Sequence, residues 1–167
     1  LYTICSDKYK VRKFVKKRIG GKHLIPLLVV SNNPNKINFN KITLPFIIKP
    51  NHMSGQYILI RNKNDINKNE IVSKCKGWLK SNYYNLSKEW QYKDIKPKIT
   101  VEKLLLNKNG KVPEDYKFHC FNGNVEFIQI ITDRFGDKKI SNFNGNWNLL
   151  PFQWCPIEND RPKYKIN

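Results

Sequence analysis

An Asn-Gly pair between two apolar runs constrains the fold of this chain more than any other feature. Residues 116–121 and 125–132 are rich in aromatic and β-branched side chains, and Asn122-Gly123 joins them. A two-residue hairpin turn favours positive φ, which Asn and Gly adopt more readily than other residues. The sequence therefore predicts an antiparallel pair of strands in the last third of the chain.

The remaining pattern predicts an α+β fold with a mainly antiparallel sheet and flanking helices. Ser6 or Asp7 can cap a first helix, which Gly20 and Gly21 then end. A polar loop at residues 51–56 separates two strands, and residues 133–167 show no clear period. In chain order, further strands are expected at 24–30, 46–50, 57–60 and 99–106, and a second helix at 67–83.

The net charge of +18 indicates affinity for anions rather than a dedicated nucleic-acid-binding domain. Of the 31 basic residues, 26 are Lys and five are Arg, whereas bidentate contacts with phosphate and guanine favour Arg. The Lys are spread along the chain, and the 22 Asn beside them indicate that A/T-rich codons contribute to the excess. We therefore expect no specific nucleic acid partner, whereas the charge suits ATP or an acidic glycan.

The sequence lacks the common motifs of nucleotide, hydrolase and metal sites. It has no GxxxxGK[ST], GxGxxG, GxSxG or HExxH.

The longest apolar run, Leu24 to Val30, is far shorter than the roughly 20 residues of a membrane helix, so no transmembrane segment is expected. The chain begins at Leu1 rather than Met, so a truncated protein is expected. The cysteines form no CxxC pair and indicate reduced thiols in a cytoplasmic protein: Cys5, Cys75, Cys120 and Cys155.

Residues 46–55 form the unit with the clearest chemical potential. Lys49 ends an apolar strand, so its ammonium group is held in place as a point charge. Ser54 and Gly55 are small enough for backbone N–H groups to approach an oxyanion closely. A phosphate-binding flap between two strands requires this combination. The alternative is an ordinary hairpin whose lysine reaches into solvent.

The order of these segments resembles that of ATP-grasp proteins. Residues 101–105, Val-Glu-Lys-Leu-Leu, are similar to the hinge strand of the D-alanine–D-alanine ligase group, whose flap strand carries a pair like Lys49-Pro50. A closer resemblance is to the TupA-like ATP-grasp family, which is associated with teichuronopeptide and other surface polysaccharide synthesis. The segments that carry it run in the family's order: 7–12, 24–28, 48–55, 89–92, 115–123, 133–135, 142–143 and 147–152.

The resemblance implies which residues bind ATP. The phosphates would be contacted by Lys49, Lys117 and Arg12, and covered by the loop from His52 to Gln56 with Ser54 and Gly55. Adenine would be framed by Glu102, Lys103, Leu104 and Leu105, and the ribose bonded by Asp115 or Glu114. Each role has a structural alternative: a solvated helix face for Arg12, an exposed strand lysine for Lys117, core packing for Leu104, a loop carboxylate for Asp115 and simple exposure for His52.

The acceptor and metal sites are less strongly indicated. Asp133 and Arg134 follow a predicted strand, where they would hold an acidic substrate or pair with each other. The resemblance also implies magnesium, held in the family on strands beyond Pro151, but the sequence Glu158-Asn159-Asp160 lacks the pattern of such a strand. The remaining metal candidates are Asp133, Asn142 and Asn144. Without two hard oxygen ligands, this chain would bind nucleotide without catalysis.

By this resemblance, the intact protein is a carboxylate–amine ligase that acts through an acyl phosphate on an acidic glycan or peptide-glycan acceptor. Residues 1–30 would lead into the nucleotide-binding region, 31–106 would form the flap and hinge subdomain, and 107–167 an incomplete second subdomain. The expected location is the cytoplasm, next to polysaccharide-assembly enzymes at the membrane; the oligomeric state stays open. The alternatives are a glycosyltransferase, for which an Asp-x-Asp motif is missing, and a non-catalytic basic module that binds anionic polymer.

Overall fold

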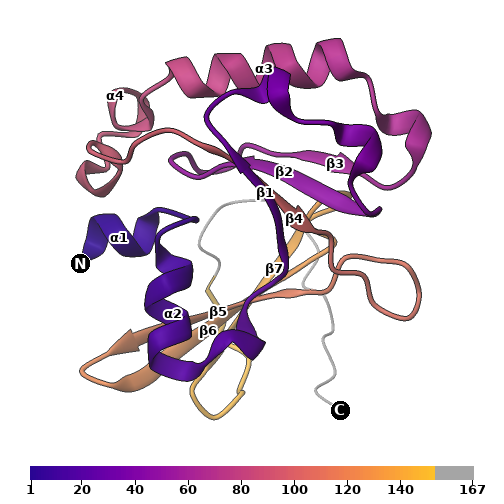
Figure 1. Cartoon of the computed structure of the whole chain (residues 1–167). Helices are drawn as coiled ribbons and strands as arrows, with labels where there is room; N and C mark the ends of the chain where they lie inside the picture. Colours follow the sequence, from indigo (N-terminus) through magenta and orange to yellow (C-terminus); the bar gives the residue numbers. More distant parts are fainter. Residues whose placement is uncertain (153–167) are drawn as a thin grey trace. The chain divides into compact units, whose positions relative to one another are not determined.

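The computed structural model describes residues 1–152 as two compact units, Leu1–Leu105 and a second that begins at Leu106 (Figure 1). The expected segments 1–30 and 31–106 thus fall almost entirely in one unit. Cys155 and the sequence Glu158-Asn159-Asp160 lie outside the described residues. Each described unit is built on its own antiparallel sheet, and few helices accompany them, which confirms the α+β class. Nowhere in residues 1–152 is a helix long and apolar enough to cross a membrane.

The sheet of the first unit has the strand order β1-β4-β2-β3, with every neighbouring pair antiparallel. In this register Lys49 lies opposite Thr100, and Ile47 lies opposite Glu102. Because paired residues point to the same face and alternate residues share a face, one face carries all four of these side chains. The strands are β1 (Leu27–Ser31), β2 (Phe46–Pro50), β3 (Ile58–Ile60) and β4 (Ile99–Lys103).

The other face of this sheet is apolar and is covered by helix α3 (Lys68–Lys80), which Figure 1 shows lying along it. The helix begins where the Asn67 side chain accepts a hydrogen bond from the Glu70 N–H. The buried side chains that pack together here are Phe46, Ile48, Ile60, Ile71, Val72, Cys75, Trp78, Ile99 and Val101. This core fixes the orientation of β2 and β4, and therefore turns Lys49 and Glu102 to the opposite face.

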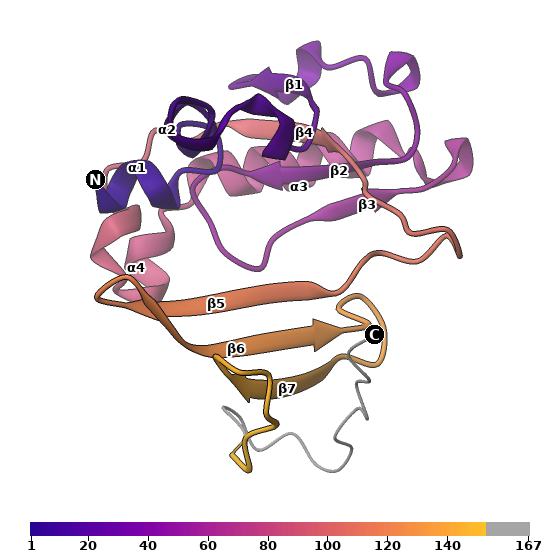
Figure 2. The ribbon, with the colours of Figure 1, turned by 90° about the horizontal axis from the view of Figure 1, so that it is seen from below.

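The N-terminal helices lie on that opposite side of the sheet, away from α3 (Figures 1 and 2). Helix α2 (Val11–Ile19) ends at Gly20, whose φ of 91° suits glycine, as predicted. The preceding helix α1 (Tyr2–Ser6) was not expected from the sequence. The remaining short elements are α4 (Tyr83–Ser87), η1 (Gly21–His23), η2 (Pro34–Lys36), η3 (Phe39–Lys41), η4 (Lys63–Asp65) and η5 (Trp90–Tyr92).

The helix expected at 67–83 is confirmed only as far as Lys80. Ser81 is extended, with ψ of 144°, and so interrupts the helical backbone. The Asn82 side chain then accepts a hydrogen bond from the Tyr84 N–H and starts α4 as a separate helix. Because the Asn82 side chain forms this hydrogen bond, a new helix starts there, and the apolar residues up to Tyr83 do not form one continuous helix with α3.

The second unit contains the predicted hairpin, with Asn122 at φ 49° and Gly123 at φ 86° in the turn. A third strand extends the sheet in the order β5-β6-β7, and its core is made of Ile128, Ile130 and Phe143. The strands are β5 (Asp115–Phe121), β6 (Asn124–Thr132) and β7 (Lys139–Asn144). Strand β7 was missed because Asn is depleted in strands; pairing with β6 overrides that weak preference.

Candidate functional site

Two cations meet one carboxylate on the polar face of the first unit's sheet. The Glu102 side chain on β4 is only 6% exposed, and its Oε2 accepts a hydrogen bond from Lys49 Nζ on β2. Its Oε1 accepts one from the Arg12 guanidinium on α2 over 3.2 Å. Arg12 also donates to the Ile25 carbonyl at 2.6 Å. Residues that are 90 and 53 positions from Glu102 in sequence are thereby fixed around it.

Lys8 completes this group; it lies in the segment 7–12 that carries the family resemblance, but no role was expected for it. Its Nζ donates to the Met53 carbonyl in the loop after β2. Burial, and then the positive charge of Lys49, lower the pKa of Lys8 from its ordinary 10.5 to about 8. We refer to Lys8, Arg12, Lys49 and Glu102 as the Glu102 cluster. The carboxylate of Asp7 also acts on Lys8, so three cations face two carboxylates, and the net positive charge suits a phosphate group.

The lowered pKa of Lys8 predicts pH-dependent anion binding. As the pH rises from 7 to 9 the cluster loses one positive charge, so we expect ATP affinity measured by calorimetry to fall about 5- to 10-fold. The unfolded chain binds more protons between pH 8 and 10.5, so this group adds stability as the pH rises through that window. A Lys8→Arg variant stays charged, so its ATP affinity should fall much less between pH 7 and 9. An equal fall in both proteins would show that Lys8 is not the group that titrates.

The Glu102 cluster rests on a buried network between Asp7 and Asn51. The Asn51 side chain is fully buried and donates to Asp7 Oδ1 at 2.9 Å and to the Lys96 carbonyl at 3.1 Å. Its Oδ1 accepts from the Lys98 N–H at 2.7 Å. Asp7 Oδ1 also accepts from the Tyr9 and Lys10 N–H groups. Strand β2 and the start of α2 are thus joined where Lys8, Arg12 and Lys49 project.

The loop from His52 to Gln56 has a fixed base and an exposed tip. His52 is buried against α3, where its Nε2 lies 3.0 Å from the Trp78 carbonyl, and burial lowers its pKa. Gln56 accepts a hydrogen bond from the Trp78 indole at 3.2 Å. Ser54 and Gly55 are exposed, and Gly55 has a φ of 75° that favours glycine. The structure therefore brings the tip, but not His52, to the surface.

The hinge segment lies at the end of β4. The N–H groups of Lys103 and Leu104 donate to the Pro26 and Pro45 carbonyls, each at 3.0 Å. These two N–H groups are therefore already used within the fold, and adenine bound at this segment would have to form hydrogen bonds with other main-chain groups. Leu104 is buried, whereas Lys103 and Leu105 are exposed. Apolar surface for a ring is thus offered by Leu105.

The candidates in the second unit lie along its sheet. Lys117 is exposed on β5, opposite Gln129 of β6. Asp115 forms an ion pair with Arg134. Asp133 does not share this pair: it sits at φ 44° in the turn after β6, and its Oδ2 accepts from the Asp137 N–H at 3.0 Å. The structure therefore places Arg134 with Asp115, and gives Asp133 a role in shaping the turn.

The three metal candidates do not converge. Asn142 pairs with Gln129 in the middle of the sheet, whereas Asp133 lies in the turn beyond the end of β6, four residues after Gln129. The Asn142 amide donates to the Phe152 carbonyl at 3.1 Å, and the Asn144 Oδ1 accepts from two N–H groups in the following turn. Across residues 1–152, no group of three or more His, Cys, Asp or Glu side chains is placed to hold a metal ion.

Comparison with known proteins bears on this site. The family described as TupA-like ATPgrasp matches residues 2–167, which is almost the whole chain. No curated protein and no solved structure matched it. The match includes the strands that carry Lys49 and Glu102 and the helix that carries Arg12. The chain therefore belongs to the TupA-like ATP-grasp family.

Proposed function

We propose that the intact protein is an ATP-dependent carboxylate–amine ligase, acting on an acidic glycan or peptide-glycan in surface polymer synthesis. Family membership points to ATP-dependent ligase chemistry. The observation that supports it most strongly is the Glu102 cluster, in which Lys49 and Arg12 bind one buried carboxylate. Lys8 connects this cluster to the loop whose exposed tip is Ser54 and Gly55. The acceptor and the pathway rest on the family resemblance.

The cluster has the charge and the rigidity that phosphate binding requires. Glu102 holds Lys49 and Arg12 in place before any ligand arrives, so their charges need little reorganisation. Lys8 ties the same site to the loop through the Met53 carbonyl. Phosphate oxygens would offer these three cations additional partners, and the exposed tip at Ser54 and Gly55 would supply N–H groups.

In the proposed reaction, a carboxylate oxygen of the acceptor forms a bond to the terminal phosphorus of ATP, and the bond from that phosphorus to its bridging oxygen breaks to release ADP. An amine nitrogen then forms a bond to the acyl carbon, the bond from that carbon to the phosphate oxygen breaks, and the nitrogen loses a proton. Lys49, Arg12 and Lys8 would orient the phosphates and offset their charge. The family also implies a divalent metal; among residues 1–152 no group of three or more His, Cys, Asp or Glu side chains is placed to hold one, and no step is assigned to it.

Replacing Lys49 by alanine tests the proposed function. We expect the full chain to bind ATP in the presence of magnesium, and the Lys49→Ala variant to bind about 10- to 100-fold more weakly, because a charged hydrogen bond to phosphate is lost. Isothermal titration calorimetry measures both affinities, and circular dichroism checks that the variant is folded.

Lys76→Ala is the matched control, since Lys76 is exposed on α3, which packs on the other face of the sheet. It removes the same charge from the chain and should leave ATP affinity within about twofold. Equal weakening by both substitutions would show that ATP responds only to overall charge. That result, with a steep dependence on salt and no preference for nucleotide, would favour a basic module for anionic polymer instead.

A further inference from the structure

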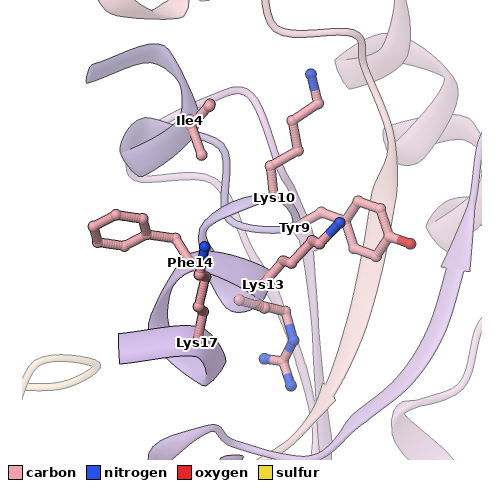
Figure 3. Close-up of a pocket in the computed structure, with 7 residues that line it drawn as sticks. Ile4, Tyr9, Lys10, Lys13, Phe14 and Lys17 are labelled. Carbon is pink, nitrogen blue, oxygen red and sulfur yellow. The ribbon is translucent and has the colours of Figure 1, made fainter. Parts of the chain in front are cut away.

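A pocket lies between α1 and α2 and shares Arg12 with the Glu102 cluster. It has a volume of about 510 Å³, which is within the usual range of small-molecule sites. Its apolar walls are Ile4, Tyr9 and Phe14, which come from α1, the turn and α2 (Figure 3). Ile4 is 43% exposed and Tyr9 39%, and Phe14 is half-buried, with the Arg18 guanidinium 5.3 Å from the centroid of its ring. This apolar surface is therefore available to a ligand.

The rim of the pocket is strongly cationic. Four of its lining residues carry positive charge, namely Lys10, Arg12, Lys13 and Lys17. Helix α2 contains no acidic residue to balance them. The neighbouring carboxylate of Asp7 is 2% exposed and is used by main-chain N–H groups and by Asn51. A pocket with apolar walls and an unbalanced positive rim selects an anionic ligand that has a partly apolar body.

Arg12 connects this pocket to the Glu102 cluster. The same side chain lines the pocket and donates to Glu102, whose other carboxylate oxygen binds Lys49. An acid group bound near Arg12 would therefore lie next to the cations that are proposed to hold the phosphates. The ligase reaction requires the acceptor and the ATP phosphates to be bound close together, because the attacking carboxylate oxygen must approach the terminal phosphorus.

We propose that the pocket between α1 and α2 holds the acceptor of the ligase reaction, a carboxylate-bearing ligand whose ring or hydrocarbon body packs on Ile4, Tyr9 and Phe14. The assignment rests on the proposed function, since an acceptor is meaningful only if ATP is the phosphoryl donor. The covalent steps are those given above, with the bound carboxylate as the attacking group. A pocket of about 510 Å³ has the size of a discrete ligand, whereas binding to a membrane surface needs no pocket.

Matched sugars test the proposal with the full chain. Glucuronate and glucose share a ring and differ in the carboxylate, so ligand-observed NMR titrations should detect glucuronate at concentrations where glucose does not bind. Lys13→Gln removes one charge and should weaken glucuronate binding about two- to fivefold. Phe14→Ala removes one apolar wall and should weaken it about fivefold or more. Lys76→Gln removes an equal charge on α3 and should leave it unchanged.

ATP binding by the parent chain is measured in parallel, so the two proposals fail separately. If ATP binds but glucuronate binds no better than glucose, or the Lys13 and Phe14 variants bind glucuronate normally, the acceptor pocket is wrong and the ligase proposal stands. If glucuronate binds in the pocket but ATP does not bind, the acceptor role is wrong and the site is only an anion pocket. Phe14-dependent binding to phosphatidylserine vesicles without glucuronate binding would overturn the proposal in favour of a membrane surface.

Discussion

Replacing Asn51 by alanine is expected to destabilise the first unit by about 3–5 kcal/mol. The Asn51 side chain is fully buried and bonds Asp7 Oδ1, the Lys96 carbonyl and the Lys98 N–H. The substitution leaves buried polar groups without their partner and opens a small cavity, and each unmet group costs about 1–3 kcal/mol. Urea unfolding followed by circular dichroism measures the change.

Hydrogen exchange provides a local measurement of the same effect. The Lys98 amide donates to Asn51 Oδ1 at 2.7 Å, so its protection should fall more than that of amides in the second unit. Asn69→Ala is the control, because Asn69 is exposed on α3 and its replacement should change stability by less than about 0.5 kcal/mol. An Asn51→Ala protein as stable as the control would mean that the network between Asp7 and Asn51 does not hold this part of the fold.

Replacing Glu102 by alanine is expected to cost about 2–4 kcal/mol of stability in the first unit, because two of its neighbours lose their counter-charge. The cost falls below that of a fully buried pair because the Arg12 and Lys49 side chains are 17% and 22% exposed. Three cations then face each other without the Glu102 carboxylate, so the variant should gain more stability from a bound anion. Thermal unfolding with and without tripolyphosphate measures both effects.

Two further variants separate charge from packing in this result. Glu102→Gln removes the charge but keeps the shape and an acceptor oxygen, so its cost reports the charge, and the difference between the two Glu102 variants reports packing together with the remaining hydrogen bonds. Glu126→Ala removes an equal charge from an exposed position on β6, and should alter stability and its response to tripolyphosphate little. If tripolyphosphate stabilises the parent and Glu102→Ala equally, the cluster is not the anion site.

Local sequence determined several elements of this protein before any tertiary contact is considered. The turn at Asn122-Gly123 follows from the positive φ that both residues tolerate, and the end of α2 at Gly20 has the same cause. Strand β2 follows from three consecutive apolar residues before Lys49, and α3 from apolar residues at helical spacing. The same information singled out Lys49, and the order of motifs indicated the family, whose resemblance put Glu102 beside adenine rather than with Lys49 and Arg12.

Only the tertiary structure decided how the side chains of the Glu102 cluster are combined. Lys8, Arg12 and Lys49 are separated along the chain from Glu102. The packing of α3 on one sheet face turns Lys49 and Glu102 to the other face, where the bond between Asn51 and Asp7 holds Lys8 and Arg12 beside them. The same folding buried His52, which the sequence places in a polar loop, and paired Arg134 with Asp115 rather than with Asp133. Local sequence governs backbone conformation, because φ preferences and side-chain spacing act over a few residues. Ion pairs, burial and pKa depend instead on which distant side chains share a face, and the whole fold sets that arrangement.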